Sequence, residues 1–350
     1  MVPSETEEVA FLRRVLIVAA VVVLALLLWR VRDALLLGFG GVVAAVLLLA
    51  IADPIEARFG ISRAWSLTVV GLGLGLVLAL VVWLVGGQAL AQATGLSDHL
   101  AGAVKELGQR LGVKLPSLPP SDGGQGGALD SSMLADMAGR VATIGGMVVN
   151  GVTALVVAVV GGFFLAADPA LYRRGAAKLL PRSQQARAED ALAASGQALR
   201  LWLIAQLISM AMVGASAGLG TWMLGLPSPL ALGLFAGLAE FVPLIGPILG
   251  AVPALLLAMA DGGGTFFWTA VLFIAIQQVE SNLIMPLVEQ RLVSLPPALL
   301  LFAVVAVGLL FGLPGVVLAA PLTVVAFVLV KKLYVRQTLG QPTEVPGEGR

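Results

Sequence analysis

The chain has 350 residues, of which 59% are hydrophobic and 12% are charged, and its formal net charge is +1. Soluble domains carry about 25% charged residues, so too few charges are present to cover a surface that faces water, and a soluble globular enzyme is nearly excluded. The absence of Cys and the single His exclude disulfides, thiolate metal sites and multi-histidine metal sites, and the balanced charge gives no field for nucleic acid. We therefore expect a membrane protein that is not an enzyme and uses no cofactor, metal ion or nucleic acid.

The N-terminal part, residues 1–87, contains three long apolar runs, which predict membrane helices because about 20 helical residues cross the hydrocarbon core of a bilayer. The runs are 15–29, 34–52 and 64–87. The first run is short. It reaches the required length if the helix begins at residue 9 and the side chains of Arg13 and Arg14 extend to the lipid headgroups. Acidic residues precede it and no small-residue cleavage site follows it, so we expect an anchored helix instead of a cleaved signal peptide.

Two segments outside the membrane follow. Residues 88–140 carry apolar residues at helical spacing beside charged ones and then a Gly- and Pro-rich stretch, which predicts an extracytoplasmic amphipathic helix and a linker. That helix could lie on the outer membrane surface or pack on a neighbouring subunit. After a fourth membrane helix at 141–167, the Arg-, Gln- and Ala-rich residues 168–200 predict a basic helical segment in the cytoplasm.

The C-terminal region 201–334 contains apolar runs that Gly and Pro interrupt. The interruptions leave arms of about 13 to 15 residues, or about 22 Å, which cannot cross a core of about 30 Å alone. We predict an all-α, polytopic helical membrane protein with two broken, re-entrant helical hairpins at 230–260 and 298–330. Paired broken segments are typical of transporter binding sites. The candidate gate residues at these interruptions are Pro243, Gly246, Pro247, Pro253, Gly312, Pro314, Gly315 and Pro321.

Polar side chains gather on the apolar run 266–287 between the two hairpins. Gln277 and Glu280 are three residues apart and share a helical face, while Gln278 and Asn282 form an adjacent stripe. A carboxylate at membrane depth is costly unless it is protonated, paired or hydrated. We therefore predict a hydrated cavity that Glu280, Asn282 and Gln277 line, with Glu280 as the proton or cation site.

Two further residues belong to this hypothesis. Glu240 lies near the tip of the first hairpin, and Pro286 breaks the helix after the polar residues. The alternative for both acids, Glu240 and Glu280, is a place at headgroup level near the end of a helix. The sequence leaves that alternative open.

The distribution of Lys and Arg predicts the orientation, because connecting segments on the cytoplasmic side carry an excess of them. All 21 lie outside the long apolar runs, and 15 fall in segments on the same side as the N-terminus. We expect both termini to be cytoplasmic, with a disordered tail over residues 335–350.

Three classes of function remain after motif searches. A phosphate loop of the form GxxxxGK[ST] is absent and no soluble region is long enough for a nucleotide-binding domain, so ATP-driven transport by this chain alone is excluded. The GxSxG pattern of a serine hydrolase is absent as well. A secondary transporter, a channel and a non-transporting scaffold are left, and the broken hairpins beside a polar helix favour a transporter with alternating access.

Three stretches resemble the sequential motifs of the autoinducer-2 exporter family of bacterial membrane proteins. They are FVPLIGPILGAVP at 241–253, Gln277 with ESNLIMP at 280–286, and FGLPGVVLAAPL at 311–322. The likeness covers nearly the whole chain. Two positions differ: Ala205 precedes Gln206 where a Gly-Gln pair is common, and Leu295 stands where a His is common.

The resemblance implies a secondary exporter or permease of a small solute, such as autoinducer-2 or a related metabolite, in the bacterial cytoplasmic (inner) membrane, with the lipid bilayer as its surroundings. Because some relatives are associated with sodium/proton antiport, a Na+(Li+)/H+ antiporter or channel-like pore with a cation substrate is the alternative, and a non-transporting membrane scaffold is the third. The resemblance also implies a homo-oligomer, for which a ring such as a pentamer is one form, and it adds Gln206 to the candidate transport residues.

Overall fold

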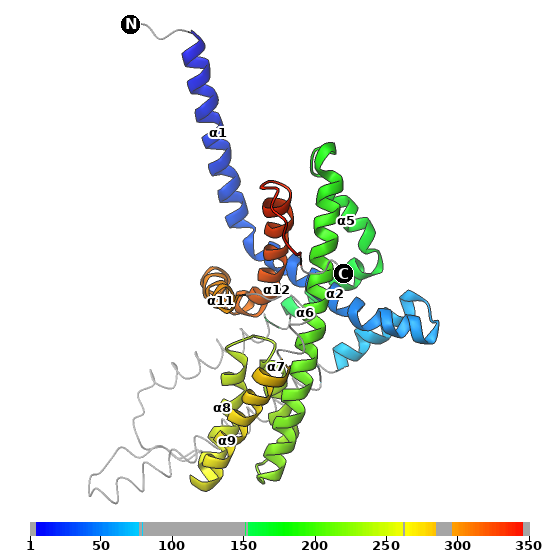
Figure 1. Ribbon diagram of the computed structural model, residues 1–350, viewed down its shortest axis with the longest axis vertical. Coiled ribbons are helices and arrows are strands. Elements are labelled where there is room, and N and C mark those ends of the chain that lie inside the picture. Colours follow the sequence, from blue (N-terminus) through cyan, green and yellow to red (C-terminus); the bar gives the residue numbers. More distant parts are fainter. Residues whose placement is uncertain are drawn as a thin grey trace, which may run out of the picture.

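The computed structural model describes residues 5–76, 79, 151, 153–261, 263–284 and 296–345, and these residues form helices joined by turns (Figure 1). The helices are α1 (Glu5–Arg30), α2 (Arg32–Phe59), Arg63–Leu76, Thr153–Ala167, α5 (Pro169–Ala177), α6 (Arg182–Met223), α7 (Pro229–Ala239), α8 (Gly246–Asp261), α9 (Gly263–Val279), the π-helix η1 (Glu280–Ile284), α11 (Pro297–Phe311), α12 (Leu313–Leu329) and the π-helix η2 (Val330–Arg336). The prediction of an all-α fold is confirmed for these residues. The predicted segment 88–140 lies outside them.

Three described helices are long and apolar enough to cross a membrane. They are Arg32–Phe59, Arg182–Met223 and Leu313–Arg336. The helix Thr153–Ala167 and α5 also pass this test as a pair, but they meet at a bend of 90°. At this bend the Asp168 side chain accepts a hydrogen bond from the backbone N–H of Leu171 at 3.0 Å, which caps α5. These lengths and compositions suit a multi-pass membrane protein.

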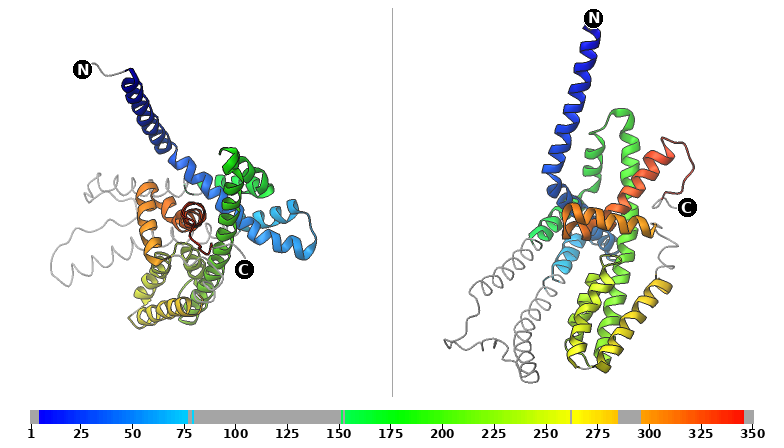
Figure 2. Two further views of the ribbon diagram at one scale, coloured as in Figure 1. Left: turned by 45° about the horizontal axis from the view of Figure 1, so that its top comes forward. Right: turned by 90° about the vertical axis from the view of Figure 1, so that its left-hand side faces the viewer.

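Helix α6 is the longest described helix, and it contacts α2, α5, α7, α9 and α12 (Figures 1 and 2). It has 42 residues, or about 63 Å at 1.5 Å per residue. Helices α7, α8 and α9 gather along its C-terminal half, while α2, α5 and α12 meet its N-terminal half (Figure 1). Helix α6 runs through residue 200, where we expected a cytoplasmic segment to end and a membrane helix to begin, since no proline interrupts 182–223. The place at which this helix enters a membrane stays a prediction.

Two ion pairs connect the N-terminal half of α6 to its neighbours. Arg200 contacts Asp53 of α2 at 2.7 Å, and Asp190 contacts Lys332 of η2 at 2.9 Å. The Lys332 side chain is buried, so its charge lies away from solvent and needs this partner. The two ion pairs hold α2 and η2 against the N-terminal half of α6.

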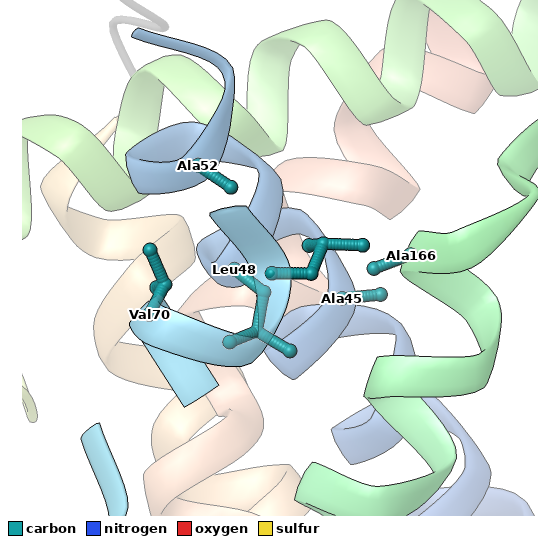
Figure 3. Packing of buried hydrophobic residues seen from close by; sticks show 6 residues of the cluster. Ala45, Leu48, Ala52, Val70 and Ala166 are labelled. Carbon is teal, nitrogen blue, oxygen red and sulfur yellow. The ribbon is translucent and has the colours of Figure 1, made fainter. Parts of the chain in front are cut away.

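Small residues allow close packing between α2 and the two helices on either side of it. Ala45, Leu48 and Ala52 of α2 form a buried cluster with Val70 and Ala166 (Figure 3). The side chains of Ala45 and Ala166 are short, so the two backbones approach each other as small residues permit in membrane helices. This cluster joins segments that are more than a hundred residues apart in the sequence.

Helix breaks occur in both regions where we predicted hairpins. Helix α7 ends at Ala239 and α8 begins at Gly246, with Leu244 at a φ of 72° in the turn between them. Gly312 separates α11 from α12 with φ 67° and ψ −148°, a conformation that essentially only glycine adopts. Whether the two helix pairs enter and leave a membrane on the same side stays a prediction.

The candidate gate residues do not all lie at these breaks. Pro243 is in the α7–α8 turn, Gly246 and Pro247 begin α8, and Pro314 and Gly315 lie in the first turn of α12. In contrast, Pro253 and Pro321 lie inside α8 and α12. These two prolines are therefore parts of helices and not of the turns.

The part of the C-terminal tail that the structure describes packs against α6 and α12. We expected disorder from residue 335, but η2 continues to Arg336. Farther along, Val345 is buried in a cluster that includes Ala194 and Val328. The apolar side chain of Val345 thus covers the contact between the two helices.

Candidate functional site

Two buried acids line one cavity beside the C-terminal half of α6. The side chains of Glu240 and Glu280 are 3% and 7% exposed. Both border a cavity of about 10 Å³. That is about the space that a single water molecule needs. The two carboxyl groups are also close enough to interact electrostatically.

Four helices supply the rest of the cavity wall. Val213 comes from α6, Ala236 from α7, Pro247 and Gly250 from α8, and Phe273, Ile276 and Gln277 from α9. Of these side chains, only that of Gln277 is polar. The acids therefore face a mostly apolar enclosure, in which a charge is poorly solvated and the protonation state depends on the nearest polar groups.

The acid on η1 is held by donors from two helices. The Ser209 hydroxyl of α6 donates to Oε1 of Glu280 at 2.5 Å. The Nε2 atom of Gln277 lies 3.4 Å from Oε2 of the same carboxylate and 3.4 Å from the Ser281 hydroxyl. Glu280 is also the first residue of the π-helix that follows α9, and single π-helical turns of this kind are frequent at functional sites.

The other acid, Glu240, is the C-cap residue that follows the last residue of α7. Its backbone oxygen accepts a hydrogen bond from Nε2 of Gln206 at 2.5 Å. The next residue, Phe241, packs edge-on against Trp202, with the ring centroids 6.1 Å apart. Two residues of α6 thus fix the start of the α7–α8 turn. Oε2 of Glu240 is buried and has no hydrogen-bond partner among the described residues.

Close contact between α6 and α7 brings the two acids into the same place. A Cβ atom added to Gly233 would lie 2.5 Å from the backbone oxygen of Gly214, and one added to Gly237 would lie 2.7 Å from that of Met210. The helices can approach this closely because these positions lack side chains. The approach places the end of α7 against α6 at the level of Gln206.

A second, larger cavity shares Glu280 with the first. Its volume is about 160 Å³, and its wall comes from α6, α9 and η1. The apolar residues Met212, Ala275 and Val279 and the hydroxyl-bearing Ser216 line it together with Glu280. Glu240 does not line this cavity. Glu280 therefore lies between the two spaces.

The structure separates some of the candidate residues from this cluster. Asn282 donates to the backbone oxygen of Gln278 at 2.8 Å and to its side-chain oxygen at 3.0 Å, and both residues are exposed. We expected Asn282 in the cavity, but it contacts its own helix on the outside. The second break, at Gly312, contributes nothing to the wall of either cavity, and Pro286 lies outside the described residues.

The sequence did not single out Ser209, although the structure places it against Glu280. The available signal was its spacing, because Gln206 and Ser209 are three residues apart and share a face of an apolar helix. No group of three or more His, Cys, Asp or Glu side chains that could hold a metal ion occurs in the described part of the chain.

Comparisons with known proteins match the chain to proteins named for transport. YrrI of Bacillus subtilis (strain 168), named only as a candidate transport protein, is 32% identical over 167 residues, which are 48% of this chain and 47% of that protein. PerM of Escherichia coli (strain K12), named as a candidate permease, is 26% identical over 283 residues, which are 75% of this chain and 77% of that protein. The first two relatives, YrrI and YueF of the same Bacillus strain, are matched over about half of their own length, 47% and 43%. The model of the AI-2E family transporter matches residues 16–334, nearly the whole chain, and the protein belongs to this family.

Proposed function

We propose that the protein is a secondary transporter, an exporter or permease of a small solute such as autoinducer-2 or a related metabolite, and that Glu280 is its coupling residue. The observation that carries the proposal is the buried Glu280 carboxylate with its donors Ser209 and Gln277. An acid at such a place in a membrane protein is costly and is therefore a functional residue by default. The family membership supports transport but leaves the solute open.

The transport mechanism that we propose is alternating access around the two helix breaks. The two cavities, of about 10 and 160 Å³, are smaller than typical small-molecule sites of about 300–1,000 Å³. A solute therefore needs the helices to move apart. The α7–α8 turn suits such a gate, since Pro247 lines the cavity and Glu240 precedes the turn. The α11–α12 break would be its counterpart.

We test the coupling role with Glu280→Gln, which keeps the shape of the side chain and removes its charge. Purified protein is reconstituted into proteoliposomes, and the flux of a small solute panel that includes autoinducer-2 is measured under proton and sodium gradients. We expect gradient-driven flux to fall by about tenfold or more, because hydrogen bonds to charged groups contribute about 1.5–3 kcal/mol and about 1.4 kcal/mol corresponds to a factor of ten. Asp261→Asn is the matched control, because Asp261 is an exposed acid at the end of α8. Unchanged flux and unchanged pH dependence in Glu280→Gln would contradict the proposal.

We further propose a homo-oligomer, for which a pentameric ring is one form, in the bacterial cytoplasmic membrane. Helix α1 extends away from the rest of the molecule (Figures 1 and 2), and its apolar side chains from Val15 to Trp29 are exposed. In a bilayer, such a helix packs against lipid or against another subunit. Cross-linking in native membranes tests the assembly. If the protein migrates only as a monomer after cross-linking, the proposal of a homo-oligomer is wrong.

A further inference from the structure

We propose that Glu240 and Glu280 act as a carboxyl pair that holds one proton between them, so that the ion coupled to transport is a proton. The inference rests on the proposed function of Glu280 and adds the second acid and the identity of the ion. In the resting pair, Glu240 carries the proton and Glu280 is ionised.

The position of the two acids favours a shared proton. Both are more than nine-tenths buried and line the same cavity, which has room for about one water molecule. When two carboxylates share such a site, the first negative charge disfavours ionisation of the second, so the resting pair keeps one proton. None of the other residues in the cavity wall, contributed by α6, α7, α8 and α9, is titratable or charged. No cation from the described residues therefore borders the cavity to neutralise a second negative charge.

The hydrogen bonds decide which acid keeps the proton. Glu280 has a donor for each oxygen, Ser209 for Oε1 and Gln277 for Oε2, and donors of this kind favour the ionised form. Oε2 of Glu240 has no partner among the described residues, and a buried acceptor without a partner is costly. A proton on Glu240 turns this carboxyl group into a donor, and the Glu280 carboxylate, with which it interacts, is the acceptor for it in the same cavity wall.

The second cavity determines the path of the proton. Glu280 borders the larger space of about 160 Å³, whereas Glu240 does not. A proton that leaves the pair therefore moves from the Glu240 carboxyl to the Glu280 carboxylate and from there to a water molecule. Both acids are then ionised and repel each other. Because Glu240 is the C-cap residue of α7 and precedes the α7–α8 turn, this repulsion acts on the turn that the proposed mechanism moves.

Infrared spectroscopy of the purified full-length protein tests the pair without a transport assay. A protonated carboxylic acid has a C=O stretch that an ionised carboxylate lacks, and this band shifts when water is exchanged for heavy water. At neutral pH we expect a band equivalent to one protonated acid per chain out of 20 Asp and Glu residues. Glu240→Gln should lose this band, and the control Asp261→Asn should keep it.

Two results would overturn the carboxyl pair. One is a wild-type spectrum without the acid band, which decides the question even if Glu240→Gln does not fold. The other is a band that persists in Glu240→Gln. The band is independent of solute transport: if the wild-type protein has it but moves no solute in the panel, the proposed transport function fails and the pair stands.

Discussion

Ser209 donates its hydroxyl hydrogen to Glu280 across the contact between α6 and η1, and hydrogen bonds to charged groups contribute about 1.5–3 kcal/mol. We expect Ser209→Ala to lower gradient-driven flux by about tenfold or more, since a loss of about 1.4 kcal/mol corresponds to a factor of ten. We also expect the pH dependence of the flux to change, because the lost donor contacts Glu280, the acid that we propose exchanges the proton. Flux in proteoliposomes at several pH values measures both effects.

A serine on the same helix provides the control for this prediction. Ser195 is also buried on α6, but its hydroxyl donates to the backbone oxygen of Ala191 at 2.8 Å, within its own helix. Ser195→Ala should therefore leave the pH dependence of the flux unchanged. If Ser209→Ala behaves in the same way, Ser209 does not position Glu280.

The sequence allowed the two acids of the site to be predicted, but not Ser209, the serine that donates to Glu280. Glu240 and Glu280 are conspicuous because they interrupt apolar stretches. Hydroxyl side chains in apolar helices usually bond to their own backbone, as Thr221 and Thr323 do here. Only the packing of α6 against η1 distinguishes Ser209 from them. The sequence likewise could not indicate that Asn282 faces outward, because helical spacing relates side chains to one another and not to a neighbouring helix.

At the scale of the helices, the contact between α6 and α7 depends on positions without side chains. We expect Gly233→Ala to lower the free energy of unfolding by about 1–3 kcal/mol, the usual cost of overpacking, since the added Cβ atom would lie 2.5 Å from the backbone oxygen of Gly214. Thermal unfolding in detergent measures this change. The control is Gly175→Ala on α5, where the added atom meets nothing within 4 Å and Ala favours the helix. Equal stability of the two variants would contradict the role of the glycine contact.

The sequence predicted where helices are interrupted better than where they continue. Gly and Pro limit backbone conformation locally, and helix breaks occur in both regions that they mark, 240–245 and Gly312. The change from polar to apolar composition near residue 200 is a different kind of signal. A change from polar to apolar side chains leaves the backbone hydrogen bonds of a helix intact, so α6 continues through residue 200. The helix therefore joins a segment that we expected in the cytoplasm directly to the C-terminal half that borders the candidate site.

At the scale of the whole molecule, the scarce charges both connect helices and predict their orientation. The pairs Arg200–Asp53 and Lys332–Asp190 join three segments at the N-terminal half of α6. All three were expected on the cytoplasmic side from the distribution of Lys and Arg. Their meeting in space is what a common side of the membrane requires.

Cysteine labelling tests this orientation with little background, since the wild-type chain has no Cys. We expect a membrane-impermeant maleimide to label Ser121→Cys, in the segment 88–140, on intact cells from which any outer membrane has been removed. Thr343→Cys, in the C-terminal tail, should be labelled only after the membrane is permeabilised, because the excess of Lys and Arg beside the tail predicts a cytoplasmic position. The wild-type protein is the control and should take up no label. The reverse pattern would place the Arg200–Asp53 and Lys332–Asp190 pairs outside the cell, and protons would then reach Glu280 from the opposite side.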